Sequence, residues 1–265
     1  MKRPTPAPDW PETWRNSYHY DLLEVFGEET DRGYAYSYEL RLAETLKMVQ
    51  RVIKPPARIL DVAAAQGNFS LKLAEMGYQV TWNDLRADLA DYVRLKHTSG
   101  EIAYAPGNVF DLGFDEAFDL VLITEIIEHV AHPDQFLKKI RKIVKPGGYV
   151  VMTTPNGGYI RNHLPRFSAC ADPSVFEAMQ FQPGAEGHIF LLHEDEIADL
   201  AVKAGLTMIE CHFFTNPVTI GHMKTSVLLD KLPRSYIRAL EDLTGLFPQP
   251  VKRRMLTSIG AIFRR

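Results

Sequence analysis

Carboxylate and imidazole side chains gather in the middle of the chain, directly after an apolar run. The run Phe118–Ile123 predicts a buried strand, and Glu125, Glu128 and His129 follow it. If a helix begins there, spacings of three and four positions place these three side chains on one face. Two carboxylates and a histidine can hold a divalent cation, and His188 is a candidate fourth ligand. The spacing therefore predicts a cation site formed by Glu125, Glu128, His129 and His188.

Two other interpretations of the same residues stay open. In the first, His129 acts as a general base without a metal ion and takes a proton from a hydroxyl group. The candidate catalytic residues are then His129 and its neighbour Glu128. In the second, Glu128 and His129 are structural and hydrogen-bond the loops around the strand.

A second group of candidate residues lies near the start of a strand–turn–helix pattern. Ile59–Val62 predicts a buried strand, Ala63–Gly67 a turn of small residues, and the segment from Phe69 an amphipathic helix. Such a unit presents backbone N–H groups to a nucleotide-like ligand. Asp61 lies at the end of the strand and can accept a hydrogen bond from an amine or a hydroxyl. The alternative is that the small residues only let the helix pack against the strand.

Asp84 follows the next predicted strand, Gln79–Trp82. An acidic residue about 20 positions after the glycines of a first βαβ unit accepts hydrogen bonds from ribose hydroxyls, and the distance from Gly67 to Asp84 fits this rule. Asp84 can instead cap a helix that begins near Leu85. The sequence favours ribose binding, and one residue can serve both purposes.

Composition limits the class of protein. A chain of 265 residues with 46% hydrophobic and 24% charged residues suits one α/β domain with elaborations. The net charge of −3 makes nucleic acid an improbable partner. Cys170 and Cys211 form no disulfide framework. No signal peptide or membrane-spanning apolar run is evident, so we expect a cytoplasmic protein.

The order of predicted elements defines the domain organisation. Residues 1–56 form an extended arm and a helical lid rich in aromatic residues, with a helix from Tyr38 to Ile53. Residues 57–265 form the main domain, with insertions at 159–187 and 217–254. After the first two strands, five more are expected, the last of them antiparallel: Ile102–Ala105, Phe118–Ile123, Tyr149–Thr154, Leu206–Thr215 and Leu256–Arg264.

Several stretches resemble the class I S-adenosylmethionine (SAM)-dependent methyltransferases, and in particular the ubiquinone-biosynthesis O-methyltransferase group. The acidic residue Asp61 and Gly67 match the first motif, although alanines stand at 63 and 65 where glycines are expected. Glu125-x-x-Glu128-His129-Val130, Lys145-Pro-Gly-Gly and Thr154-Pro-Asn match in order and spacing. The resemblance covers about residues 57–216, and an analogous Glu-x-x-Glu-His set binds metal in small-RNA 2′-O-methyltransferases.

The resemblance implies a Rossmann-like α/β fold with a seven-stranded sheet in the order 3-2-1-4-5-7-6 and helices on both faces. It implies SAM as cofactor, with Asn108 at the adenine edge, Val109 over the adenine ring and an acceptor pocket built by the 159–187 insertion. The complete set of expected cofactor-binding residues is Asp61, Ala63, Gly67, Phe69, Asp84, Leu85, Asn108, Val109 and Thr124.

The predicted activity is methyl transfer from SAM to a small-molecule hydroxyl. The alternatives are a metal-assisted RNA 2′-O-methyltransferase and a non-catalytic SAM-binding or membrane-associated accessory protein. The segment from Lys231 to Arg265 holds eight basic and two acidic residues. Such a segment can be a solvated face, an anionic-substrate site or a peripheral membrane contact. The sequence predicts no oligomeric state.

Overall fold

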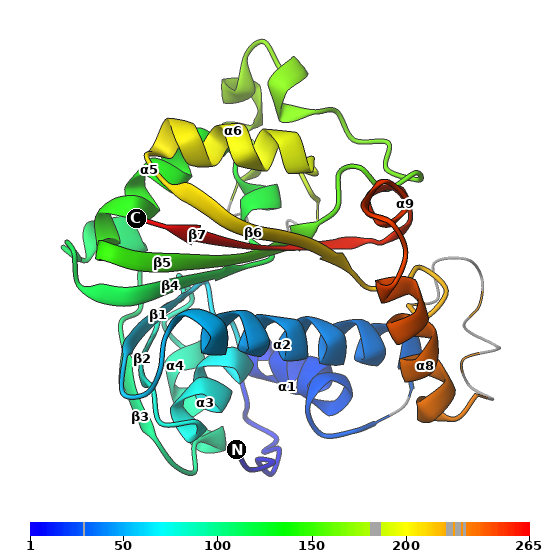
Figure 1. Ribbon diagram of the computed structural model, residues 1–265. Coiled ribbons are helices and arrows are strands. Elements are labelled where there is room, and N and C mark those ends of the chain that lie inside the picture. The colour runs from blue at the N-terminus through cyan, green and yellow to red at the C-terminus, as the bar shows by residue number, and fades with distance from the viewer. Residues whose placement is uncertain (29, 181–186, 221–224, 226–228, 230–231) are drawn as a thin grey trace.

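A single mixed sheet forms the centre of the protein. The computed structural model describes residues 1–28, 30–180, 187–220, 225, 229 and 232–265 (Figure 1). Its strands lie in the order β3-β2-β1-β4-β5-β7-β6, which confirms the predicted topology. β7 is antiparallel to β5 and β6, and the other neighbours are parallel. The strands are β1 (Arg58–Val62), β2 (Gln79–Trp82), β3 (Glu101–Tyr104), β4 (Phe118–Thr124), β5 (Val144–Pro155), β6 (Thr207–Phe214) and β7 (Ser258–Arg264).

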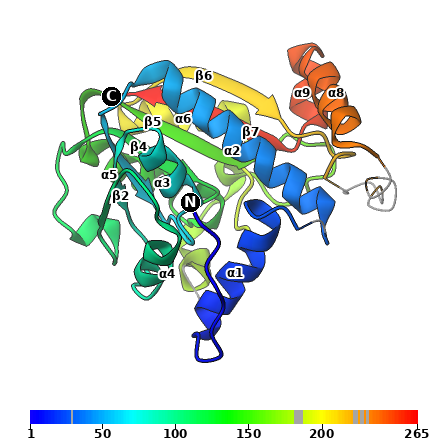
Figure 2. The ribbon, with the colours of Figure 1, turned by 90° about the horizontal axis from the view of Figure 1, so that it is seen from below.

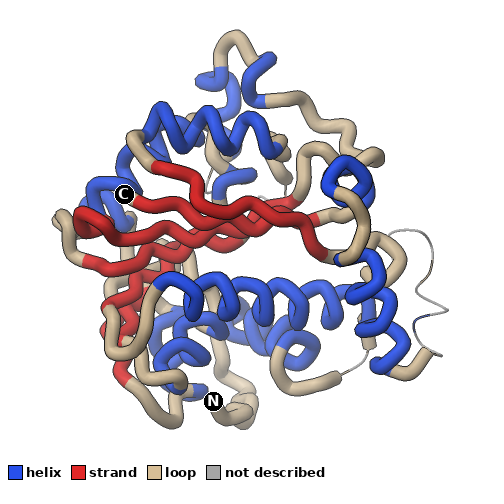
Figure 3. The backbone as a smooth tube through the Cα atoms, viewed as in Figure 1, coloured by secondary structure: helices blue, strands red, loops and turns tan. Residues whose placement is uncertain are grey.

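Helices cover both faces of the sheet (Figures 1 and 3). One face carries α2 (Arg32–Val52) and α3 (Asn68–Glu75), and the other carries α5 (Pro133–Ile143) and α6 (Glu194–Ala204). Successive strand residues point to opposite faces, so each central strand contributes to two cores. Leu60 and Val121 belong to the core under α5 and α6, whereas Ile59 and Leu120 belong to the core under α2 and α3.

Two helices begin at other residues than predicted. α2 begins at Arg32 rather than near Tyr38, because the Asp31 side chain caps it by accepting a hydrogen bond from the Tyr34 N–H at 3.0 Å. α4 (Leu89–Lys96) begins at Leu89 rather than near Leu85. The residues between Asp84 and α4 form a turn instead of a helical start.

The junction of α5 and β5 also differs from the prediction. α5 ends at Ile143, so Pro146–Gly148 does not cap it. The next residue, Val144, is fully buried and pairs with Phe118 of β4. The register then shifts, and Tyr149 pairs with Leu120. Burial of a β-branched side chain against β4 therefore extends the strand back to Val144 from its predicted start at Tyr149.

The two insertions carry short helices. The 159–187 segment contains the 3₁₀ helices η3 (Phe167–Ala169) and η4 (Pro173–Met179), and the 217–254 segment contains α8 (Arg234–Gly245) and most of α9 (Gln249–Met255). Figures 1 and 2 place α8 and α9 side by side.

Basic residues of the C-terminal segment form ion pairs with distant carboxylates: Arg238 with Glu39, Arg253 with Glu194 and Arg265 with Glu116. Peripheral membrane contact stays a prediction. Among the described residues, every helix is too short or too polar to cross a bilayer.

The first helix, α1 (Glu12–Glu24), is held to the domain by a buried ion pair. Lys96 at the end of α4 and Asp21 of α1 are both fully buried, with 2.7 Å between Nζ and the carboxylate. Asn68 and Tyr92 also donate to this carboxylate, at 2.7 and 2.6 Å. Because Asn68 is the first residue of α3, Asp21 connects α1 with both α3 and α4.

We expect Lys96→Met to destabilise the fold by about 3–5 kcal/mol, because the substitution leaves the Asp21 carboxylate buried without its cation. Urea unfolding followed by circular dichroism measures the loss. The matched control is Arg94→Met on the same helix, whose exposed pair with Asp91 contributes less than about 1 kcal/mol. Equal stabilities of the two variants would contradict this account of the ion pair.

Candidate functional site

Three neighbouring cavities form a row at the carboxyl ends of the parallel strands. The first, which we call the apolar cavity, has a volume of about 320 Å³ and is lined by Leu85, Asn108, Val109 and neighbouring residues. The second, the loop cavity, has about 680 Å³ and lies against the turn after β1. The third, the polar cavity, has about 470 Å³ and lies against the 159–163 segment.

Shared residues connect the cavities. Ala63 lines both the apolar cavity and the loop cavity. Arg41 and Glu125 line both the loop cavity and the polar cavity. The three cavities therefore adjoin one another, and Arg41 and Glu125 stand at the boundary between the loop cavity and the polar cavity.

The turn after β1 keeps a glycine-type backbone although it contains alanines. Ala63 and Ala65 have φ of 51° and 47°, and Gly67 has φ of 73°. At Gly67 an added Cβ would lie 2.8 Å from a methyl group of Val93, so glycine is required there. The two alanines hold a left-handed conformation that costs a non-glycine residue about 1–2 kcal/mol. The Trp82 indole, donating to the Ala65 carbonyl at 3.0 Å, helps to hold them in place.

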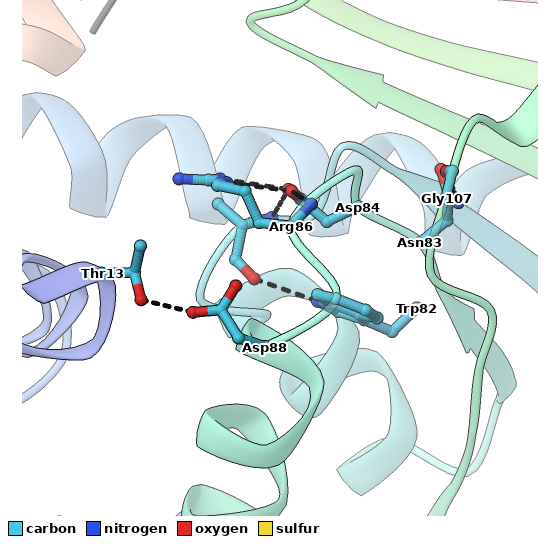
Figure 4. A network of polar contacts seen from close by, with 8 residues as sticks. Thr13, Trp82, Asn83, Asp84, Arg86, Asp88 and Gly107 are labelled. Carbon is cyan, nitrogen blue, oxygen red and sulfur yellow. Dashed lines mark hydrogen bonds and ion pairs between the residues drawn. The ribbon is translucent and has the colours of Figure 1, made fainter. Parts of the chain in front are cut away.

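Asp84 fastens this turn to the end of β2 (Figure 4). Its carboxylate accepts hydrogen bonds from the Ala65 N–H at 2.8 Å and from the Arg86 N–H at 2.9 Å. The Arg86 guanidinium pairs with the same carboxylate at 3.0 and 3.1 Å. Because α4 starts at Leu89, Asp84 does not cap it, which corrects that alternative. Arg86 itself lines the loop cavity.

Asp61 is buried behind the turn rather than exposed to a cavity. The Ser70 hydroxyl donates to its carboxylate at 2.6 Å. Burial raises the pKa of Asp61 to about 7. Of the two partners considered for Asp61, a hydroxyl is the one present, and it comes from α3 of the same chain.

The residues expected to bind the cofactor divide into two sets. Six line the apolar or loop cavity: Ala63, Phe69, Leu85, Asn108, Val109 and Thr124. The other three, Asp61, Gly67 and Asp84, shape and fasten the turn. The Asn108 side chain is oriented by its own loop, since it accepts from the Phe110 N–H at 3.2 Å and donates to Asp111 at 3.0 Å.

The residues after β4 do not form the helix on which the four-ligand prediction depends. Glu125 has a left-handed backbone with φ of 53°, and a 3₁₀ helix covers only Ile127–His129. Glu125 pairs instead with Arg41, at 3.3 Å between guanidinium and carboxylate. Among the described residues, the cluster with cation-ligand geometry consists of Glu128, His129 and His188, whose ligand atoms lie within 4.8 Å of one another.

Glu128 is the buried member of this cluster. The Thr154 hydroxyl donates to one of its carboxylate oxygens at 3.1 Å, and the other oxygen has no hydrogen-bond partner in the described part of the chain. Burial, together with the negative charge of Glu125, raises the pKa of Glu128 well above its ordinary value. The protonated form of Glu128 is therefore more favoured than that of an exposed glutamate.

The two histidines occupy different positions. His188 lines the polar cavity, and burial and the nearby His129 lower its pKa. His129 lies behind it, with 5.0 Å between the ring centroids, and its Nδ1 is 3.3 Å from the Gly187 carbonyl oxygen. Within the described residues, His188 rather than His129 contacts the polar cavity.

Two N-terminal residues were missed by the sequence analysis. Arg41 lines two adjoining cavities, and its Nε has no hydrogen-bond partner within the described residues. Glu24 lines the loop cavity and accepts hydrogen bonds from Gln66 of the turn and Asn68 of α3, at 2.7 and 2.9 Å. The sequence pattern that could have revealed Arg41 is its helical spacing from the buried residue Tyr38.

The sheet order, the strand–turn–helix at β1 and the cavities at the carboxyl edge define the class I SAM-dependent methyltransferase fold. Solved structures agree. A SAM-dependent methyltransferase from Mesorhizobium loti matches with a TM-score of 0.57 at 16% identity over 84% of this chain and 96% of that one. Phosphoethanolamine N-methyltransferase 2 from Haemonchus contortus, in complex with SAM, matches with a TM-score of 0.59 at 18% identity over 95% of this chain and 57% of that one.

Sequence comparison gives the family. The family model described as "Methyltransferase domain" matches residues 33–211. The chain therefore belongs to this methyltransferase family, within the class of SAM-dependent methyltransferases.

Two relatives are named ubiquinone biosynthesis O-methyltransferase. The one from Xanthomonas campestris pv. campestris is 30% identical over 55% of this chain, and the match spans only 65% of that relative's length. The one from Hydrogenovibrio crunogenus is 30% identical over 69% of this chain and 74% of its own length.

The alanine turn gives a test of the backbone geometry. We expect Ala65→Gly to stabilise the protein by roughly 0.5–1 kcal/mol, because relief of the left-handed strain exceeds the entropy that glycine adds to the unfolded chain. Ala64→Gly is the matched control, because the adjacent Ala64 does not have a positive φ and should lose roughly 0.5–1 kcal/mol. Thermal unfolding measures the change in stability of both variants, and a destabilised Ala65→Gly protein would contradict the expectation.

Proposed function

We propose that this protein transfers the methyl group of SAM to an oxygen atom of a small molecule. The observation that carries the proposal is the row of three adjoining cavities at the carboxyl edge. The apolar cavity suits an adenine ring, the loop cavity suits ribose and methionine, and the polar cavity suits an acceptor. The reacting atoms would then meet at the boundary of the loop and polar cavities, beside Arg41 and Glu125. The names of the sequence relatives support oxygen as the acceptor atom.

The reaction itself needs little covalent chemistry from the protein. The acceptor oxygen forms a bond to the methyl carbon, and the carbon–sulfur bond breaks with its electron pair passing to sulfur. The sulfonium becomes a neutral thioether, and the hydroxyl proton passes to a base. Alignment of the two reactants in adjoining cavities can supply on the order of 7–11 kcal/mol of the barrier reduction.

Two N-terminal residues suit the charged groups of the methionine part of SAM. The Arg41 guanidinium matches its carboxylate, because Arg41 lines the loop cavity and its planar group of donors suits a carboxylate. The Glu24 carboxylate matches its ammonium group and already holds the turn through Gln66. Burial raises the pKa of Glu24, and a bound ammonium would favour its ionised form.

Asp84 is proposed to hold the ribose hydroxyls, which requires the Arg86 guanidinium to give up part of its contact. Asp84→Asn keeps the shape of the side chain but removes charge-assisted hydrogen bonds worth roughly 1.5–3 kcal/mol. We therefore expect SAM affinity to fall roughly tenfold to hundredfold in calorimetry.

Arg86→Met is the matched control, since it releases the Asp84 carboxylate and should bind SAM at least as tightly as the wild type. Unchanged affinity in folded Asp84→Asn would rule out ribose binding by Asp84.

His188 is the proposed proton acceptor, supported by His129 and Glu128. His188 lines the polar cavity, and its lowered pKa favours the neutral imidazole that can take a proton. His129 packs against its ring, with 5.0 Å between the centroids, and helps to hold it at the cavity.

A divalent cation on Glu128, His129 and His188 stays a prediction. Two imidazoles and a carboxylate fit such an ion, which would lower the pKa of an acceptor hydroxyl when bound. The raised pKa of Glu128 and the pairing of Glu125 with Arg41 both weaken the donor set.

We expect methyl transfer to persist in excess chelator and to fall about 10²–10⁴-fold in His188→Ala. The control is His97→Ala, a half-buried histidine after α4 that is not among the described lining residues of the three cavities, which should keep wild-type turnover. Labelled SAM measures the transfer. Loss of activity in chelator, restored by excess manganese or zinc, would reject methyl transfer without a metal ion and show that a divalent cation is required.

A further inference from the structure

An adenine ring in the apolar cavity needs hydrogen-bond donors as well as apolar contacts. Its ring nitrogens accept hydrogen bonds, and burying an acceptor without a donor is unfavourable. A donor among the polar side chains of the lining therefore decides how well the cavity distinguishes adenine from another flat ring. The described lining includes six polar side chains: Asn83, Asn108, His132, Gln135, Lys139 and Gln180.

The two asparagines of this lining are engaged by the loops that they hold. Asn83 donates from its amide nitrogen to two backbone carbonyl oxygens, at 2.7 and 2.9 Å. Asn108 both accepts from and donates to residues of its own loop, at 3.2 and 3.0 Å. Gln135 and Lys139 are exposed side chains of α5. The remaining two polar residues of the lining, His132 and Gln180, lie together at another part of the wall.

The 159–187 insertion brings Gln180 to this cavity. Gln180 directly follows η4, and η4 is attached to the loop before α5, since the Glu177 carboxylate lies 2.7 Å from Nε2 of His132. Gln180 reaches the same loop, because its Oε1 accepts a hydrogen bond from the Ala131 N–H at 2.8 Å. Two contacts on neighbouring residues therefore hold the Gln180 side chain at a defined place in the cavity wall.

The contact with Ala131 fixes which end of the Gln180 amide is the donor. A backbone N–H can only donate, so the atom that it meets is the oxygen, and Nε2 takes the other position. Nε2 lies 3.5 Å from the Glu177 carbonyl oxygen, longer than an ordinary N–H···O bond of about 2.7–3.2 Å. Nε2 carries two hydrogens, and this long contact engages only one of them. The side chain therefore keeps a donor for a ligand in the cavity that it lines.

We propose that Gln180 recognises the adenine ring of SAM by donating a hydrogen bond from Nε2 to one of the ring nitrogens. The inference rests on the proposed function, because it takes the apolar cavity as the adenine site. The 159–187 insertion then serves both reactants, since Tyr159 near its start lines the polar cavity and Gln180 lines the apolar cavity. Gln180 is a specificity-determining residue for the cofactor, remote from the reacting atoms.

The test compares ligands that differ in a single ring nitrogen. Calorimetry on the full chain measures the affinity of S-adenosylhomocysteine, the form of the cofactor that has lost its methyl group, and of its 1-deaza, 3-deaza and 7-deaza analogues. Each analogue replaces one ring nitrogen by C–H and so removes one acceptor. We expect at least one analogue to bind the wild-type protein roughly fivefold to tenfold more weakly, which is the change that one neutral hydrogen bond makes.

Gln180→Glu keeps an oxygen for the Ala131 N–H but replaces the donor by a second acceptor. We expect one of the wild-type preferences for S-adenosylhomocysteine over an analogue to disappear in this variant. A merely structural role would instead weaken all four ligands by the same factor and leave the preferences unchanged. Gln135→Glu is the matched control, because Gln135 lines the same cavity from α5, and it should keep every preference. Thermal midpoints check that both variants fold.

Equal binding of all four ligands by the wild-type protein, or preferences that are unchanged in Gln180→Glu, would overturn the proposal. Loss of a preference in Gln135→Glu alone would assign the recognition to α5 and overturn it as well. Each of these outcomes includes binding of S-adenosylhomocysteine and leaves the proposed methyl transfer standing. Failure of the wild-type protein to bind S-adenosylhomocysteine at all would, in contrast, reject the proposed function and this inference with it.

Discussion

The buried contact between Lys96 and Asp21 is the constraint on which the arrangement of the site depends. It fixes α1 against α3 and α4, and three positions further along α1, Glu24 reaches the turn after β1. Without α1 in this place, the loop cavity would lose one of its walls. A buried ion pair is weak evidence for stability, but it fixes geometry strictly, because neither charge can move away without losing its partner.

The strands of the sheet were predictable because the residues that define each strand are adjacent in the sequence. Apolar runs of four to seven residues, separated by helical patterns, locate the parallel strands, and the family resemblance supplies their order. The predicted starts of elements were wrong where a contact with a residue distant in the sequence determines them. β5 extends back to Val144 because that residue pairs with Phe118, and α4 starts late because Asp84 bonds Arg86 and the turn. Nothing within the helical pattern itself reveals either contact.

In the candidate site, too, local sequence patterns have to be distinguished from contacts between residues distant in the sequence. The carboxyl ends of parallel strands meet at one edge, and Asn108 and Thr124, which were expected to bind the cofactor, line cavities there; their role in binding stays a prediction. The helical spacing did not describe Glu125 correctly. Glu125 has a left-handed backbone where a helix was expected, and its carboxylate pairs with Arg41. Arg41 and Glu24 were missed because their importance comes from contacts across the fold. The edge of the sheet where the cavities lie was thus predictable, and the charged residues that line them from the N-terminal helices were not.

The position of β7 between β5 and β6 has a consequence for the order of events during synthesis. β6 ends at Phe214 and β7 begins only at Ser258, so both β5 and β6 exist before the strand that joins them. At about 5–20 residues per second, a ribosome needs roughly 2–9 s for the intervening segment. During that interval β5 presents an open, apolar edge of the kind that promotes association between nascent chains. The nascent protein is therefore most vulnerable to aggregation after strands β1 to β6 have already been made.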